Sequence, residues 1–245
     1  MRHPGMLSSV LAVILFLPLE QALAMHISEG ILQASWVILW FALVIPFVAL
    51  GLRELGIRNE RDPRFKPMVG LVGAAVFLIS CMPIPVPIVG TCSHPCGTGM
   101  AAVLVGPSVT VVMASVALLL QALFLAHGGL TSLGANVLTM GVVGAFLGYG
   151  AFLLARRTGL SWPAAAFLAG LISDWATYAA TSMVLAFALH GQVSFLDMFL
   201  TISLAFIPTQ VPLGVLEGFM AAGAISFVKT RRPELLALLA RGGAP

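Results

Sequence analysis

The sequence predicts an all-α polytopic membrane protein with about seven transmembrane helices after a cleaved signal peptide. Hydrophobic residues make up 60 % of the 245 residues and charged residues only 9 %, whereas an ordinary soluble domain carries roughly a quarter charged residues. The apolar runs are long and unbroken, while the strands of a membrane barrel alternate with a period of two. This composition excludes a cytosolic enzyme, a disordered chain and a nucleic-acid binder.

The first 24 residues have the pattern of a secretory signal peptide. Arg2 supplies a positive start, Met6–Leu19 is apolar, and the sequence ALA at 22–24 is a typical cleavage site. An uncleaved first transmembrane helix is the alternative, but the apolar stretch is shorter than the roughly 20 residues that a span needs. Cleavage would leave Met25 with a free terminal amine outside the membrane.

Six apolar runs follow: Ala34–Leu52, Met68–Gly90, Thr98–Ala126, Ala135–Ala155, Ala164–Leu189 and Met198–Val228. Basic residues cluster after the first, fourth and last runs, within 53–66, 156–157 and 229–241. The remaining linkers carry almost no Lys or Arg: 91–97, 127–134 and 190–197. By the positive-inside rule the basic clusters face the cytoplasm and the other linkers lie outside. The mature N-terminus is therefore predicted outside, and the tail 231–245 in the cytoplasm.

The run Thr98–Ala126 must cross twice or re-enter, because both of its ends are predicted outside. Its natural break is Gly106-Pro107. The run would be about 43 Å long as a helix, short of the about 60 Å that two crossings need. One leg should therefore be short or buried in protein. Counting both legs gives seven segments within a membrane domain at 25–230.

The polar residues predicted outside offer nitrogen ligands for a metal ion. The mature chain would begin Met25-His26, and its amine, the amide nitrogen of His26 and the His26 ring would close two chelate rings in one plane. A fourth nitrogen would complete a square-planar site, which favours Ni(II), Cu(II) and some Co(II) over Zn or Mg. His94 is the candidate, with a solvated loop histidine as the alternative. Cys92 and Cys96 flank it and could be soft ligands, a disulfide or buried thiols.

Four other side chains could support this site. Glu29 could accept a hydrogen bond from a ligating histidine, and Ser28 is its neighbour. His127 could orient a ligating histidine or cap a helix C-terminus. Asp174 lies at membrane depth, where ionisable groups are costly and often functional. Asp174 and Glu217 have no Arg or Lys within their spans, and we interpret both as buried structural carboxylates that could brace the site.

Several segments between residues 25 and 228 form one pattern. They are MHISEGIL at 25–32, REL at 53–55, SHP at 93–95 with GTG at 97–99, QALFLAHGGLTSLGAN at 121–136, Asp174 with TY at 177–178, and TQVPL at 209–213 with EG at 217–218. This pattern resembles the CbiM/NikM family, the substrate-binding membrane subunits of energy-coupling-factor cobalt and nickel importers. Residues 53–55 resemble the first cytoplasmic loop of that family.

The resemblance implies a seven-helix subunit in a bacterial inner membrane, with its metal site facing the periplasm. Met25, His26 and His94 would bind the ion. It also implies a transmembrane coupling subunit of CbiQ type, cytoplasmic ATPases of CbiO type and, as an optional member, a small accessory membrane subunit of CbiN type. No Walker A sequence occurs in the chain, so ATP hydrolysis is expected in a separate subunit.

The expected function is import of Co(II) for cobalamin biosynthesis, without a cofactor and without enzymatic activity. Ni(II) is the alternative substrate, because both ions accept nitrogen-rich planar sites. An intramembrane hydrolase using Asp174 or His127 with a serine is a rival of another class, although the G-x-S-x-G nucleophile turn is absent from the sequence. A metal-independent vitamin importer subunit of similar architecture is a further rival.

Overall fold

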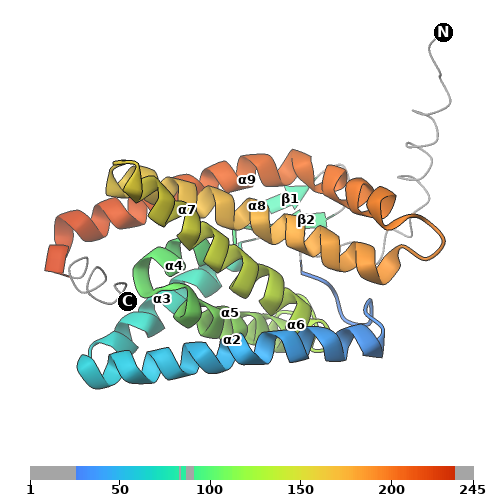
Figure 1. The fold of residues 1–245 in the computed structure, drawn as a ribbon, viewed down its shortest axis with the longest axis horizontal. Coiled ribbons are helices and arrows are strands. Elements are labelled where there is room, and N and C mark those ends of the chain that lie inside the picture. Colours follow the sequence, from blue (N-terminus) through green and yellow to red (C-terminus); the bar gives the residue numbers. More distant parts are fainter. Residues whose placement is uncertain (1–25, 83, 87–90, 235–245) are drawn as a thin grey trace, which may run out of the picture.

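A computed structural model describes residues 26–82, 84–86 and 91–234. This part of the chain is almost entirely helical (Figure 1). The helices are α2 (Ala34–Arg61), α3 (Phe65–Ser80), α4 (Thr98–Val105), α5 (Pro107–Phe124), α6 (Leu133–Asn136), the π-helix η1 (Val137–Gly144), α7 (Ala145–Arg157), α8 (Trp162–Leu189) and α9 (Phe195–Arg231). Because α6, η1 and α7 follow one another without a gap, they form one segment, and the described helices make seven segments as predicted.

Four of these segments are long and apolar enough to cross a membrane: α2, α5, the continuous α6–α7 segment and α9. Large apolar side chains cover the outside of the bundle; Leu71, Phe124 and Phe219 are 74 %, 75 % and 65 % exposed. Soluble monomers rarely expose so many large apolar side chains, and lipid is the solvent that suits them. The chain is therefore an all-α polytopic membrane protein. The signal peptide at 1–24 lies outside the described residues and stays a prediction.

The predicted cytoplasmic linkers lie at the end of the bundle opposite two of the three predicted outer linkers, 127–134 and 190–197. The α2–α3 turn, the α7–α8 turn and the C-terminal end of α9 share one end, at the left of Figure 1. The start of α2, the α5–α6 loop and the α8–α9 turn lie toward the other end. The described residues of all three basic clusters thus belong to one end, as the positive-inside rule requires. Which end faces the cytoplasm stays a prediction.

The run from Thr98 to Ala126 is broken where the sequence suggested. Gly106 has a φ of 91°, which separates α4 from α5, and Pro107 opens α5. A positive φ is accessible to glycine at little cost, and proline suits the first turn of a helix. α4 has eight residues, of which seven are buried. The prediction of a short leg enclosed by protein is confirmed.

Two boundaries differ from the prediction. Residues 53–55 lie inside α2, which continues to Arg61, so they are not a loop. The helix continues because Arg58 pairs with Glu54 at 2.5 Å and donates to the carbonyl of Val105 at 2.9 Å, at the C-terminus of α4. The run 68–90 is likewise not one helix: α3 ends at Ser80, before a stretch in which every second residue is proline.

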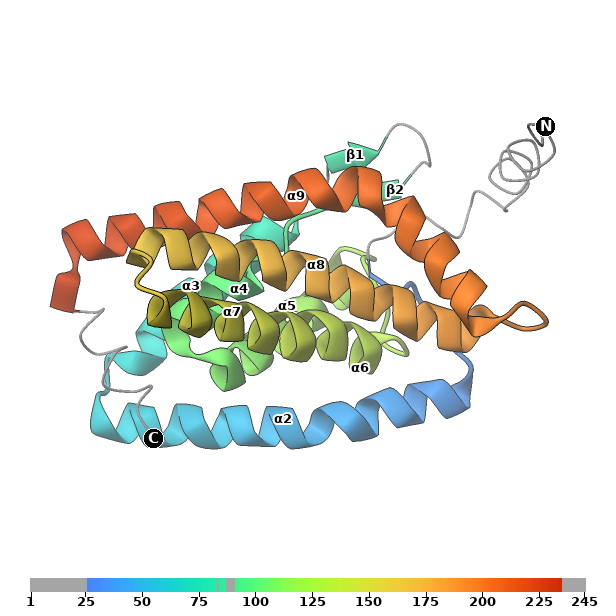
Figure 2. The same cartoon turned by 45° about the horizontal axis from the view of Figure 1, so that its top comes forward.

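A small hairpin follows α3. Strand β1 (Ile84–Val86) pairs with β2 (Thr91–Ser93) in antiparallel fashion, with Ile84 opposite Ser93. The hairpin lies beside α9 where that helix bends (Figure 2). Pro208 and Pro212 lie inside α9, and each removes a backbone hydrogen bond, which accounts for the bend. The chain then turns into the buried helix α4.

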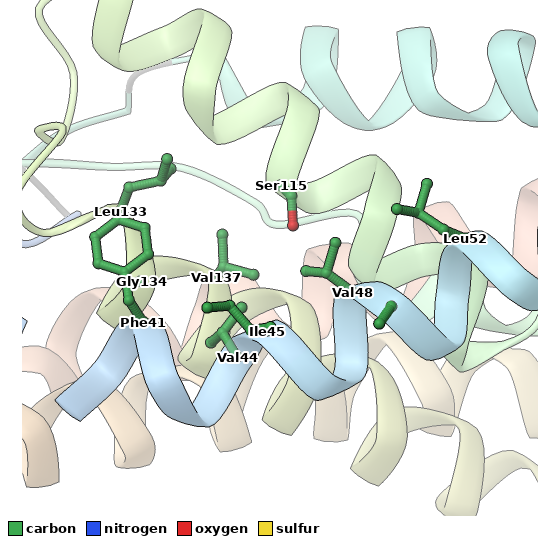
Figure 3. Close-up of a pocket in the computed structure, with 10 residues that line it drawn as sticks. Phe41, Val44, Ile45, Val48, Leu52, Ser115, Leu133, Gly134 and Val137 are labelled. Atoms are coloured by element: carbon green, nitrogen blue, oxygen red, sulfur yellow. The ribbon is translucent and has the colours of Figure 1, made fainter. Parts of the chain in front are cut away.

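An apolar pocket lies between α2, α5 and the α6–η1 segment (Figure 3). Its lining includes Phe41, Ile45, Val137 and the one hydroxyl of Ser115. That hydroxyl already donates to the Val111 carbonyl at 2.8 Å. The pocket therefore offers no ligand for an ion, and the polar clusters described below lie elsewhere in the bundle.

Candidate metal centre

Three histidines from distant parts of the sequence meet at one end of the bundle. His26 precedes α2, His94 lies between β2 and α4, and His127 follows α5. The His26 ring centroid lies 4.8 Å from that of His94 and 4.8 Å from that of His127, and the latter two are 5.0 Å apart. One nitrogen from each ring lies within 4.8 Å of the other two. The structure thus brings the two predicted histidine ligands together with His127.

A chain of hydrogen bonds fixes the tautomer of His26. The Ser80 hydroxyl donates to the Phe77 carbonyl at 3.0 Å, so its oxygen accepts from Nε2 of Gln121 at 2.6 Å. Oε1 of Gln121 is then the atom that faces Nε2 of His26, at 3.0 Å. Because an amide oxygen only accepts, His26 must carry its proton on Nε2. The lone pair of its ring is therefore on Nδ1, available to an ion.

His94 is held in the opposite tautomer. Its Nδ1 lies 3.0 Å from the carbonyl oxygen of Pro95, which can only accept, so Nδ1 carries the proton. The lone pair is on Nε2, which lies 2.9 Å from Nε2 of His127. In this state His127 donates to His94. Hydrogen bonds of this kind orient the ring of a metal-binding histidine and select its ligating nitrogen.

The segment after His26 is held by side chains of the α5–α6 region. Asn136 accepts from the Ile27 amide at 2.9 Å and donates to the Ile27 carbonyl at 3.1 Å. The Ser132 hydroxyl donates to the same carbonyl. The Ile27 side chain is 2 % exposed. These contacts bind the backbone of Ile27 as a strand partner would, and they fix the residue next to His26.

Glycines at 128 and 129 make room for the N-terminal segment. A Cβ at Gly129 would lie 2.6 Å from Cα of Glu29, and one at Gly128 would lie 3.2 Å from Cβ of His26. The Glu29 carboxylate accepts from the Thr131 amide at 3.1 Å. Hydrogen bonds from the side chain of Thr131, and next from its amide, lower the pKa of Glu29. Glu29 thus fastens the segment to the loop, and within the described part of the chain it forms no hydrogen bond with a histidine.

Burial keeps the histidines neutral. His26 and His94 are 4 % and 1 % exposed. Desolvation lowers the pKa of His94 to about 3. Desolvation, and then the neighbouring rings of His94 and His127, lower the pKa of His26, and burial also lowers the pKa of His127. Neutral imidazoles are the form that binds a metal ion, so the cluster is ready to ligate at neutral pH.

The other predicted site residues have different positions. Met25 lies outside the described residues, and Ser28 is partly buried beside the docked segment. Asp174 does not contact the histidines; it lies with Cys96 and Glu217 in a second cluster. Cys96 is a free, buried thiol, so it does not form the disulfide that was one alternative for it.

Three residues that build the site were not among the predicted site residues. Gln121, Ser132 and Asn136 all lie within the segment 121–136, which resembles the family pattern. Hydrophobic periodicity does not reveal them, because each acts through a contact with a residue about a hundred positions away. A polar side chain at an apolar helix position, such as Gln121, is the one sequence signal that they share.

Comparison with known proteins identifies the family. The family model described as "Cobalt uptake substrate-specific transmembrane region" (CbiM) matches residues 26–235. The chain belongs to the CbiM family. It is 60 % identical over 212 residues to the cobalt transport protein CbiM of Sorangium cellulosum, covering 86 % of this chain and 94 % of that protein. The family resemblance found in the sequence is confirmed.

Other relatives extend this result. The chain is 58 % identical over 214 residues to the cobalt transport protein CbiM of Geobacter sulfurreducens, covering 87 % of this chain but 62 % of that protein. A crystal structure of a protein described as a transition metal transporter has a TM-score of 0.74 and covers 90 % of this chain, at 22 % sequence identity. At that identity the likeness is one of fold, and it agrees with the CbiM assignment.

Proposed function

We propose that this CbiM family member is the metal-binding membrane component of a cobalt importer. It takes Co(II) from outside the membrane at a site built on the mature N-terminus, and passes the ion inward when partner ATPases act. The observation that carries this proposal is the meeting of two buried imidazoles, those of His26 and His94, with the partly buried imidazole of His127, beside the predicted start of the mature chain. Two of those rings are held by hydrogen bonds that leave a lone pair for an ion.

The proposed ligands are the amine of Met25, the amide nitrogen and Nδ1 of His26, and Nε2 of His94. Amine and amide close a five-membered ring with the ion, and amide and Nδ1 close a six-membered ring. Only Nδ1 can close the second ring, and the Gln121 contact leaves this nitrogen without a proton. The tautomer found in the structure is therefore the one that the chelate requires.

His127 is proposed to hold the site in order before the ion arrives. It donates to Nε2 of His94, the same nitrogen that the ion would take. Binding therefore breaks this hydrogen bond, and the His127 ring either turns away or offers its own lone pair. Either way His94 is kept in its ligating orientation while the site is empty, which reduces the ordering cost of binding.

Several observations favour cobalt and a transporter over the alternatives. The relatives are named as cobalt transport proteins, which favours Co(II) over Ni(II) and a transport role over an intramembrane hydrolase. The nitrogen-rich cluster suits a transition-metal ion better than a vitamin. Since the sequence holds no Walker A motif, we propose that subunits of CbiQ and CbiO type, with CbiN as an optional partner, supply coupling and ATP hydrolysis. Cobalamin biosynthesis is the proposed use of the ion.

The free amine of Met25 provides the most direct test. Protein that starts at Met25 is compared with protein that keeps one additional glycine before Met25, and Co(II) affinity is measured by equilibrium dialysis in detergent. The extra residue moves the amine out of the chelate, so we expect affinity to fall by at least about 100-fold, beyond the range seen for changes outside the ligand set. His94→Ala should have a comparable effect.

The control keeps the same extra glycine at the C-terminus, where it should leave binding unchanged. Mass spectrometry of the membrane-inserted protein shows where the mature chain begins. Equal Co(II) affinity with and without the N-terminal glycine would remove the amine from the site and with it the proposed mechanism of capture.

A further inference from the structure

A second cluster of ligand-type side chains lies inside the bundle. It consists of Cys96 from the segment before α4, Asp174 from α8 and Glu217 from α9, with one ligand atom from each within 4.8 Å of the others. All three are buried: Cys96 and Asp174 are 0 % exposed and Glu217 is 3 % exposed. None of the three takes part in the histidine cluster or in the proposed capture of the ion.

The two carboxylates differ in their bonding. Glu217 is anchored, because its Oε1 accepts from the amides of Cys96 and Gly97, the latter at 3.1 Å. These amides lie at the N-terminal end of α4. Accepting their hydrogen bonds is by itself a sufficient structural reason for a carboxylate at position 217. Asp174 has no such explanation. Both of its carboxylate oxygens are buried and have no hydrogen-bond partner among the described residues.

A buried carboxylate without a partner is costly at membrane depth. Among the described residues no basic side chain forms an ion pair with Asp174, and no hydrogen bond joins it to Glu217. A divalent cation would supply the missing partner and neutralise the negative charges of the cluster. Sulfur with carboxylate oxygens is a donor set that first-row transition metals accept, whereas Mg²⁺ and Ca²⁺ avoid sulfur.

The position of the cluster suits an ion that is moving inward. Asp174 lies near the middle of α8, and Glu217 lies past the middle of α9 from its outer end. Cys96 follows His94 by two residues, so one short segment carries a ligand of each cluster. The next donor along this segment after His94 is therefore Cys96.

We propose that Cys96, Asp174 and Glu217 form a second site for a divalent transition-metal ion, deeper in the bundle than the histidines. The site holds the ion between its capture outside and its release inward. Its use in transit rests on the proposed function, whereas its ability to bind an ion rests only on the three donors. The ion displaces the thiol proton of Cys96 on binding, because thiolate is the ligand form of cysteine.

The test uses Co(II) alone, titrated into the full mature chain in detergent. Bound cobalt per chain is measured by elemental analysis after equilibrium dialysis, and thiolate ligation is detected as a sulfur-to-cobalt charge-transfer band in the near ultraviolet. We expect two ions per wild-type chain together with this band. Cys96→Ser should lose the band and one ion, and Asp174→Asn should weaken the second ion by at least about tenfold.

Two further variants make the result decisive. His94→Ala should lose the outer ion and keep the charge-transfer band, so that a failure of the outer site is distinguished from a failure of the inner one. Asp197→Asn removes an exposed carboxylate at the start of α9 and should change neither ion. Retention of the outer ion by Cys96→Ser shows that this variant is folded. A single ion per wild-type chain without the band, or a second ion that survives Cys96→Ser, overturns the proposal.

Discussion

The contact between His26 and Gln121 decides which nitrogen of His26 faces an ion. Gln121 is 0 % exposed, and its amide is oriented by the Ser80 hydroxyl behind it. The order of groups from the Phe77 carbonyl to His26 admits only one direction of donation. Such a chain selects a tautomer, which histidine alone does not do, since its two neutral tautomers are both accessible in water.

Gln121→Leu tests this selection at the residue scale. Leucine has a similar volume but cannot accept from Nε2, so the proton of His26 is free to move to Nδ1. We expect Co(II) affinity to fall by about 10- to 100-fold, the usual effect of losing a hydrogen bond to a metal-binding histidine. Gln121→Glu retains an acceptor at this position and should bind more tightly than Gln121→Leu. Equal affinities for these two variants would contradict the role of the acceptor.

Metal-free protein should lose stability as the pH falls below the ordinary histidine value of 6.5. Burial lowers the pKa of His94 to about 3, so between about pH 3 and 6.5 the unfolded chain binds more protons at His94 than the folded chain does. Burial also lowers the pKa of His26, which acts in the same direction. Folding is then opposed by up to about 1.4 kcal/mol per pH unit for each such ring. The melting temperature in detergent should be lower at about pH 5 than at about pH 7.5.

His94→Gln is the control for this pH dependence. It removes one of the buried rings, so the difference in melting temperature between the two pH values should shrink. A wild-type melting temperature that is the same at both pH values would show that these rings are not held neutral by burial.

At the scale of elements, the site depends on how the N-terminal segment meets the α5–α6 loop. The segment has no regular structure before α2, and its position comes from Asn136, Ser132 and the glycine pair at 128–129. Asn136 is followed directly by the π-helix η1. π-Helical turns inside α-helices occur often at functional sites, and here the irregular turn adjoins the side chain that holds Ile27.

Gly129→Ala tests this docking. The added methyl group would meet the carboxylate Oε2 of Glu29 and would lie 2.6 Å from its Cα and 2.7 Å from its backbone nitrogen, so backbone as well as side chain would have to shift. We expect the N-terminal segment to shift and Co(II) affinity to fall by at least about tenfold, while the helical content by circular dichroism stays the same.

Gly150→Ala on α7 is the matched control. A Cβ there meets nothing within 4 Å, so binding should be unchanged and the helix slightly more stable, by up to about 1 kcal/mol. If the two alanine variants bind Co(II) alike, the close approach of the loop to Glu29 does not control the site.

At the scale of the whole molecule, the bundle separates charge from the histidine cluster. The basic turns share one end, and the start of α2, which His26 precedes, and the α5–α6 loop, which contains His127, lie toward the other. The C-terminal end of α2 also contacts α4, because Arg58 donates to the Val105 carbonyl. The turn before α3 and the buried break at Gly106 are thus tied together at the end opposite the site.

The orientation of this bundle in the membrane is open to a direct test. A fluorescent reporter fused after residue 245 should fold and fluoresce, because the basic cluster at 229–241 is expected in the cytoplasm. Alkaline phosphatase inserted in the α8–α9 turn, within 190–194, should be active, since that turn is expected outside. The reverse pattern would place the histidine cluster on the cytoplasmic side and exclude capture from outside.

Much of the architecture is a property of the sequence itself. Apolar composition, span length and the position of basic residues depend on local chemistry, and they predicted the class of fold and the short buried leg broken at Gly106-Pro107. The family pattern and the pairing of His26 with His94 could also be predicted, because both rest on residue types at fixed positions in the sequence. The expectation that residues 53–55 belong to a loop was wrong, because local charge does not reveal that Arg58 finds a partner on α4.

The tertiary structure alone decided the details on which ion binding depends. The tautomers of His26 and His94, the donation by His127 and the anchoring of Ile27 all arise from contacts between segments far apart in the sequence. Asp174 was expected to brace the histidines and instead lies with Cys96 and Glu217. The physical reason is the same throughout: a hydrogen bond or a ligand set is defined by positions in space, and helix packing sets those positions.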